Sequence, residues 1–355
     1  MSNHWRPGDG FRRGRLKERG QRQDECSAAN PAPCALLAFR PVSESQASNG
    51  RRHARGVLSM PAADSISKEG GEDGRRITSG FGVAMPRFIY GTAWKKERTA
   101  TLVELALRSG FRGVDTACQP KHYHEAGVGE ALSAASRNGL ARSEIYVQTK
   151  FTPLAGQDPN DVPYDPKASL SRQVIQSFEM SLRNLRTDYL DGLLLHSPYS
   201  DDRDTLEAWR AMERLYDQGG VRQLGVSNFY EPRRLAALCR NARIKPAVIQ
   251  NRFYAKTHYD KDIRAFCKES GLVYESFWTL TANPEVLAAP DMIELAAKYG
   301  RSPAQLFFRY LTQIDIVCLT GTSSKEHMEQ DLSIFEFRLS PAECETLSAL
   351  LLQSP

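Results

Sequence analysis

Short apolar runs alternate with longer amphipathic segments eight times, from about Pro86 almost to the end of the chain. The short runs predict strands, and the segments between them predict helices, because their apolar residues recur at intervals of three and four. The expected strands are residues 87–92, 111–117, 145–150, 190–196, 222–229, 246–253, 272–278 and 315–322. Eight strand–helix units in a row predict an α/β chain folded as a single (β/α)8 TIM barrel.

The segments between these runs have clear helical patterns, and a doubly wound sheet is the alternative way to arrange them. The best patterns cover residues 171–186, 204–220, 290–300, 302–313 and 340–351. A doubly wound nucleotide-binding sheet would carry a G-x-G-x-x-G turn after a strand, and no strand here is followed by one. The barrel is therefore the preferred fold.

Net charge separates the chain into two parts. The first 80 residues contain 14 Lys and Arg against 9 Asp and Glu, so they carry the whole net charge of +5. Their Arg-, Gly- and Ser-rich composition predicts a disordered extension over 1–80, followed by a barrel domain over 81–355. A targeting or nucleic-acid-binding role for this extension and a translation start at Met60 are alternative interpretations. Because residues 81–355 are neutral, we expect no nucleic-acid partner for the barrel.

Cysteine and hydropathy patterns limit the environment of the protein. The seven cysteines are scattered without a C-x-x-C pair, which argues against a zinc site or a disulfide framework and favours a reducing, cytoplasmic location. The longest apolar runs, such as the "CALLAF" of 34–39, are far shorter than the roughly 20 residues that cross a bilayer. We therefore expect no metal and no membrane partner.

Polar residues follow the predicted strands at their C-terminal ends, which is where barrel enzymes place their active sites. Single residues of this kind often only meet solvent, but here nearly every strand ends with one. They are Thr92, Asp115, Lys150, His196, Ser227, Asn228, Gln250, Asn251 and Thr320 to Thr322.

Asp115, Lys150 and His196, together with a nearby tyrosine, could deliver a proton to a carbonyl oxygen. A tyrosine is protonated at neutral pH, since its ordinary pKa is about 10, and a neighbouring lysine would lower that pKa. Asp115 would keep Lys150 charged and oriented, and a neutral His196 would orient the carbonyl. Reduction of a carbonyl also needs a hydride source, which implies a nicotinamide cofactor.

The motifs "GVDTA", "VGEAL", "YVQTK", "DYLDGLLLHSP", "GVSNF" and "PAVIQNRF" together resemble those of the aldo-keto reductase superfamily, over roughly residues 86–345. The resemblance implies an NAD(P)H-dependent carbonyl reductase of the alcohol dehydrogenase (NADP+) type. Its catalytic tetrad would be Asp115, Tyr123, Lys150 and His196. The implied cofactor-binding residues are Thr92, Ser227, Asn228, Gln250, Phe277 or the adjacent Trp278, Gly321, Thr322, Ser323, Ser324, Lys325 and Gln330. Trp94, His122 and Phe151 would line the substrate pocket.

The loop that carries the tyrosine departs from the family pattern. The family places its tyrosine five residues after the aspartate, where this chain has Pro120, whereas Tyr123 is eight residues along. Counting back from Glu125 instead puts the family position on His122. We favour Tyr123, because a phenol beside a lysine suits the proton transfer, and His122 stays open as the alternative.

The cofactor-binding end departs from the pattern as well. The NADPH-binding members of the family have a lysine and an arginine that contact the 2′-phosphate, and Gly321 and His327 stand at the matching places. A helix start with Thr322, Ser323 and Ser324, and Lys325 close by, would still suit an anion. NADPH is expected only from family habit, and NADH is possible.

Two other functions fit the same barrel. Lys150 could form a Schiff base in a lyase, or the chain could be a non-catalytic cofactor-binding subunit that resembles the β-subunits of potassium channels. The short C-terminal segment after the last helix pattern predicts an open pocket, and with it a broad range of small aldehydes or ketones. We expect a monomer or a weak dimer.

Overall fold

The computed structural model describes residues 74–353. The predictions for residues 1–73, including disorder of the basic extension and a start at Met60, lie outside the described residues. The described part belongs to one compact unit of the chain and contains the whole barrel.

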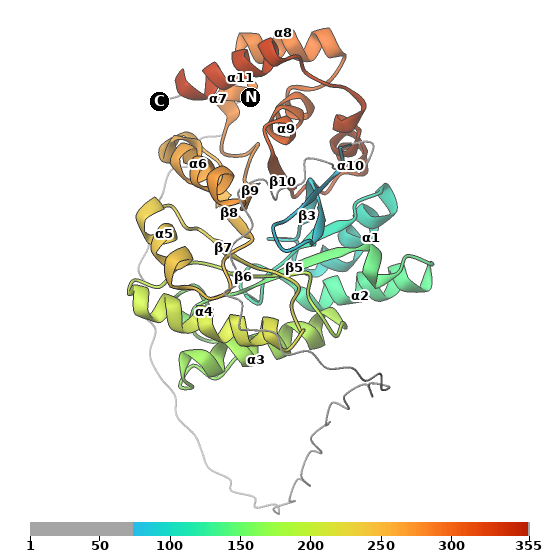
Figure 1. Ribbon diagram of the computed structural model, residues 1–355. Coiled ribbons are helices and arrows are strands. Elements are labelled where there is room, and N and C mark those ends of the chain that lie inside the picture. Colours follow the sequence, from blue (N-terminus) through green and yellow to red (C-terminus); the bar gives the residue numbers. More distant parts are fainter. Residues whose placement is uncertain (1–73, 354–355) are drawn as a thin grey trace, which may run out of the picture. The chain divides into compact units, whose positions relative to one another are not determined.

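Eight parallel strands close into a barrel, which confirms the predicted fold (Figure 1). Around the barrel the strands pair in chain order, and β10 pairs with β3 to close it. The strands are β3 (Phe88–Gly91), β4 (Gly113–Asp115), β5 (Tyr146–Phe151), β6 (Gly192–Leu195), β7 (Leu224–Ser227), β8 (Val248–Arg252), β9 (Val273–Phe277) and β10 (Ile316–Thr320). All eight lie within the runs predicted from the sequence, apart from Phe151 at the end of β5.

Helices surround these strands (Figure 1). Several of them begin with ordinary capping features: Ser302 and Gln305 form a capping box at α9, and proline occupies the first turn of α5, α8 and α9. The helices are α1 (Thr99–Ser109), α2 (Glu125–Arg137), α3 (Leu170–Leu185), α4 (Asp202–Asp217), α5 (Pro232–Asn241), α6 (Lys261–Ser270), α7 (Pro284–Leu287), α8 (Pro290–Tyr299), α9 (Pro303–Gln313), α10 (Lys325–Leu332) and α11 (Pro341–Gln353).

A short antiparallel hairpin precedes the barrel and was not predicted. It consists of β1 (Arg76–Thr78) and β2 (Ala84–Pro86). Ile77 and Met85 are buried in one cluster with residues of the barrel interior, and Gln223, just before β7, donates to the Met85 sulfur. The hairpin therefore closes the end of the barrel at which the strands begin.

The barrel interior changes character along its axis. The cluster next to the hairpin is apolar, with Ile89, Leu194, Val248 and Val317 among its members. Towards the C-terminal strand ends, where the catalytic residues were predicted, the interior is filled by polar side chains instead. Within residues 74–353, no helix is both long enough and apolar enough to span a membrane.

Candidate active site

An ion pair between Asp115 and Lys150 lies at the centre of the site. Asp115 ends β4, Lys150 lies on the neighbouring β5, and the two residues are 3% and 1% exposed. Lys150 Nζ donates to Asp115 Oδ1 at 2.7 Å, to Oδ2 at 2.6 Å, and to the Thr116 carbonyl at 2.9 Å. Burial lowers the pKa of Lys150, but Asp115, together with Tyr123 and Glu275, outweighs burial and raises that pKa above its ordinary value. Lys150 is therefore a fixed positive charge.

The ring of Tyr123 lies beside this pair. Its centroid is 5.3 Å from Lys150 Nζ, and it forms a T-shaped pair with the ring of His196, with centroids 5.9 Å apart. Burial raises the pKa of Tyr123, while Lys150 acts in the opposite direction. The predicted influence of Lys150 is thus present, but burial exceeds it. The hydroxyl stays protonated throughout the physiological range.

His196 follows β6 and is half-buried. Burial and the nearby charge of Lys150 hold its pKa well below the ordinary value, so the imidazole is neutral. Its Nδ1 lies 2.6 Å from Thr152 Oγ1, and its backbone carbonyl accepts from Asn228 Nδ2 at 2.9 Å. The Thr152 contact orients the ring through Nδ1, which leaves Nε2 as the ring nitrogen that can bind another group.

His122, the alternative to Tyr123, makes different contacts. Its ring lies against Trp94 with centroids 4.1 Å apart, and its Nδ1 is 3.0 Å from Gln119 Oε1. Trp94 also donates its backbone N–H to the His122 carbonyl at 2.7 Å. Trp94 is largely exposed, so this tilted ring pair forms an aromatic surface made by the loop after β3 and the loop before α2.

The residues predicted to hold the nicotinamide lie at the ends of β7 and β8. Ser227 and Gln250 are buried, and Ser227 accepts from Asn228 Nδ2 at 3.3 Å. Gln250 Nε2 donates to Asp115 Oδ1 at 2.9 Å and to Glu275 Oε2 at 2.8 Å. Both hydrogens of that amide are used inside the barrel.

Thr92 and the aromatic pair at the end of β9 flank the same opening. Thr92 is buried and donates through both its backbone N–H and its hydroxyl to the Asp115 carbonyl. Phe277 is half-buried, whereas Trp278 is exposed and has the Arg252 guanidinium 4.1 Å from its ring centroid. Left-handed backbone recurs here, with φ of 63° at Trp94, 56° at Asn228 and 57° at Trp278.

The loop after β10 starts the helix predicted to bind the cofactor phosphate. Ser324 caps α10 by accepting from the His327 N–H, and Thr322 accepts the Tyr90 hydroxyl through its carbonyl. The Lys95 ammonium donates to the Gly321 carbonyl. Lys95 thus brings a positive charge to the loop from which the family's lysine is missing.

Some predicted residues lie apart from this cluster. Phe151 is buried in the core with its ring 5.6 Å from that of Tyr164. Lys325 is exposed and pairs with Glu329 at 3.1 Å, and Ser323 is also exposed. Gln330 is half-buried and donates to Glu326 Oε1.

Sequence reasoning missed several residues that the structure brings to the site. They are Lys95, Gln148, Thr152, Arg252 and Glu275. The one strong sequence signal among them was a glutamate inside the apolar run "LVYESFW".

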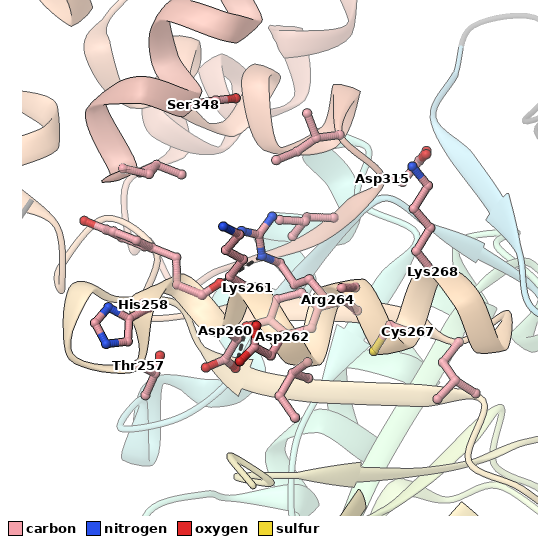
Figure 2. Close-up of a pocket in the computed structure, with 18 of the residues that line it drawn as sticks. Thr257, His258, Asp260, Lys261, Asp262, Arg264, Cys267, Lys268, Asp315 and Ser348 are labelled. Atoms are coloured by element: carbon pink, nitrogen blue, oxygen red, sulfur yellow. Dashed lines mark hydrogen bonds between the residues drawn. The ribbon is translucent and has the colours of Figure 1, made fainter. Parts of the chain in front are cut away.

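A separate groove of about 1390 Å³ lies on the flank of the barrel (Figure 2). It runs beside α6 and is lined by His258, Lys261, Arg264 and Asp315 among others. None of the residues predicted to act in catalysis or to bind cofactor or substrate lines it.

Comparison with known proteins identifies the class. Residues 80–351 match the model of the aldo/keto reductase family. The chain is 31% identical over 273 residues to glyoxal reductase of Bacillus subtilis, a match that spans 76% of this chain and 90% of that protein. It is 29% identical over 300 residues to human aldo-keto reductase family 1 member A1, covering 76% of this chain and 87% of the relative.

Solved structures agree with these matches. An aldo/keto reductase from Brucella melitensis is 26% identical, with a TM-score of 0.66 over 78% of this chain and 98% of that one. An aldo-keto reductase from a Medee basin deep-sea metagenome is 28% identical, with a TM-score of 0.65 over 75% and 91% of the two chains. The chain therefore belongs to the aldo/keto reductase family. It is an oxidoreductase of a family that acts on carbonyls and uses nicotinamide cofactors.

Proposed function

We propose that the protein reduces small aldehydes or ketones to alcohols with NADPH, with Tyr123 as the proton donor. The single observation that carries this proposal is the buried Asp115–Lys150 pair with the Tyr123 ring 5.3 Å from Lys150 Nζ. A permanently charged lysine beside a protonated phenol is the arrangement that a proton donor to a carbonyl oxygen needs.

The neighbours of Tyr123 orient the carbonyl and stabilise the charge that forms during the reaction. Neutral His196 can donate a hydrogen bond from Nε2 to the carbonyl oxygen if Nδ1 accepts from the Thr152 hydroxyl, and its lowered pKa supports the neutral form. Tyr123 then gives its proton to that oxygen as the carbonyl carbon receives a hydride, and the positive charge of Lys150 stabilises the phenolate that remains. A bound nicotinamide cofactor supplies the hydride.

The residues at the mouth fit a nicotinamide in chemical type. Because both amide hydrogens of Gln250 are used by Asp115 and Glu275, its Oε1 is left to accept from the NH2 of a carboxamide. The Ser227 hydroxyl can donate to the carboxamide oxygen, and the half-buried ring of Phe277 can stack on the nicotinamide.

Charge near α10 supports NADPH over NADH. The N-terminus of α10 offers free N–H groups and a favourable dipole to an anion. Lys95, held at the Gly321 carbonyl, adds a cation that could face the 2′-phosphate in place of the lysine that the family has there.

The lyase alternative is disfavoured by the same ion pair. A Schiff base forms from a neutral amine, whereas Asp115 holds Lys150 in its charged form. The non-catalytic alternative shares every cofactor contact and differs only in turnover.

Initial rates over a panel of aldehydes and ketones, with NADPH and NADH in parallel, test the proposal. We expect turnover of several small carbonyls and a higher kcat/KM for NADPH. Cofactor binding without turnover of any carbonyl would favour a regulatory subunit, and trapping of substrate on Lys150 by borohydride would favour the lyase.

A further inference from the structure

A ring of four polar side chains crosses the barrel interior, and one of its members is Asp115 of the proposed catalytic pair. Gln148 Nε2 donates to Asp115 Oδ1 at 2.9 Å and to Glu275 Oε2 at 2.7 Å. Gln250 Nε2 donates to the same two oxygens, at 2.9 and 2.8 Å. The two amides therefore bridge the two carboxylates twice.

Register explains why these four residues meet. Asp115 is paired with Gln148 across β4 and β5, and Gln250 is paired with Glu275 across β8 and β9. In the closed order of strands these two pairs lie on opposite sides of the barrel. Their buried side chains meet inside the barrel.

Glu275 is the unusual member of the ring. It is 0% exposed, its Oε1 has no hydrogen-bond partner among residues 74–353, and no residue forms an ion pair with it there. Burial of a carboxylate with so little compensation is costly, so a group of this kind is kept for a reason other than stability.

We propose that Glu275 is a positioning residue for the proton donor, and this rests on the proposed carbonyl reduction. Glu275 holds both amides so that each donates to Asp115 Oδ1, and its charge sets how strongly the buried Asp115–Lys150 pair acts on Tyr123. With Glu275 protonated, the three groups carry no net charge. With Glu275 ionised they carry one negative charge, which opposes loss of the Tyr123 proton and slows reduction.

The surroundings of Glu275 bring its pKa into the neutral range. Burial raises the pKa of Glu275 to about 7, with the amides of Gln148 and Gln250 acting in the opposite direction. The titratable groups that face it are Asp115 from β4, and Tyr146 and Lys150 from β5. Its register partners on β8 and β10, Gln250 and Val317, carry no ionisable group.

Glu275→Gln tests the proposal, because it keeps the size and shape of the side chain and removes its charge. In the wild type, kcat/KM for reduction should fall as the pH rises through about 7. The variant should lack this decline, and at pH 8.5 it should be faster than the wild type by roughly three- to tenfold, since one unit of Tyr123 pKa corresponds to at most a tenfold change. An unchanged decline, or equal loss of activity at all pH values in a folded variant, would overturn the proposal.

Two further variants provide a second test and a control. Gln148→Leu removes a donor that lowers the pKa of Glu275, so the decline should move to higher pH, and this result stands even if Glu275→Gln fails to fold. Asp331→Asn is the matched control, because burial also raises the pKa of that carboxyl to about 7 while its contact is with Thr320. The decline should persist in this control, whatever its absolute rate, and its loss would assign the decline to Asp331.

An NMR measurement separates this inference from the proposed function. With tyrosine labelled at the Cζ carbon, and the Tyr123 signal assigned from Tyr123→Phe, the wild-type shift should titrate with a midpoint near pH 7. It should be flat in Glu275→Gln. If no carbonyl is reduced, the proposed function fails, yet this titration still decides whether Glu275 acts on Tyr123, and a flat wild-type signal would contradict that.

Discussion

The C-terminal end of the barrel, called the mouth here, and the flank groove beside α6 are both lined by charged residues. The buried carboxylates at the two places have different kinds of partner. At the mouth, the buried carboxylate of Asp115 is paired with a buried lysine and lies beside a tyrosine. In the groove, where Figure 2 labels Asp260, this buried carboxylate accepts from two neutral groups, Asn251 Nδ2 at 2.7 Å and Tyr274 Oη at 2.9 Å.

This difference shows that the size of a hollow does not locate the chemistry. The groove is spacious, about 1390 Å³, yet its carboxylate is satisfied by neutral donors and serves to join β8, β9 and the segment before α6. At the mouth, the charges of Asp115 and Lys150 lie at neighbouring strand ends and act on the pKa of Tyr123, and interacting ionisable groups of this kind are characteristic of active sites.

The largest effects should come from breaking the ion pair at the mouth. Lys150→Met and Asp115→Asn should each reduce kcat/KM for carbonyl reduction by about 10²- to 10⁴-fold, because both remove support from the proton donor. Circular dichroism should show an intact barrel. Wild-type turnover in a folded variant of either kind would refute the catalytic assignment.

A smaller effect should follow from loosening His196. Thr152→Val deletes the hydroxyl next to His196 Nδ1, and kcat/KM should fall by up to roughly tenfold, the equivalent of one hydrogen bond. The matched control is Thr205→Val, since Thr205 is a buried threonine whose hydroxyl bonds backbone carbonyls beside α4. Equal losses in the two variants would mean that the effect is only structural.

The smallest effect on activity should come from the groove. Asp260→Asn should leave kcat/KM within about twofold of the wild type. It should lower the free energy of unfolding by about 1–3 kcal/mol, because two buried donors lose a charged acceptor. Denaturant unfolding and initial rates measure the two quantities. A large loss of turnover at normal stability would show that the groove takes part in catalysis.

Much of the fold could be predicted because its signals are local. Each strand–helix unit carries its own apolar period, and parallel strands in chain order leave few other topologies. The β1–β2 hairpin was missed because strands of three residues are too short to show an alternation.

Within the site, sequence could identify groups at strand ends but not those beneath them. Asp115, Lys150 and His196 lie where strands end, so the barrel model brings them together. Glu275 lies within a strand, and its partner Gln148 comes from the opposite side of the barrel, so only the closed register reveals the contact. Spacing could not choose between Tyr123 and His122, because the lengthened loop no longer keeps the family's number of residues between Asp115 and the tyrosine.

The central claim is that Tyr123, not His122, is the proton donor, and paired substitutions test it most directly. Tyr123→Phe keeps the ring and removes the hydroxyl, so carbonyl reduction should fall by about 10²-fold or more, with cofactor affinity, measured by fluorescence quenching, nearly unchanged. His122→Ala should remove the ring contact with Trp94 and mainly raise KM. An active Tyr123→Phe together with an inactive but folded His122→Ala would contradict this account and assign the proton to His122.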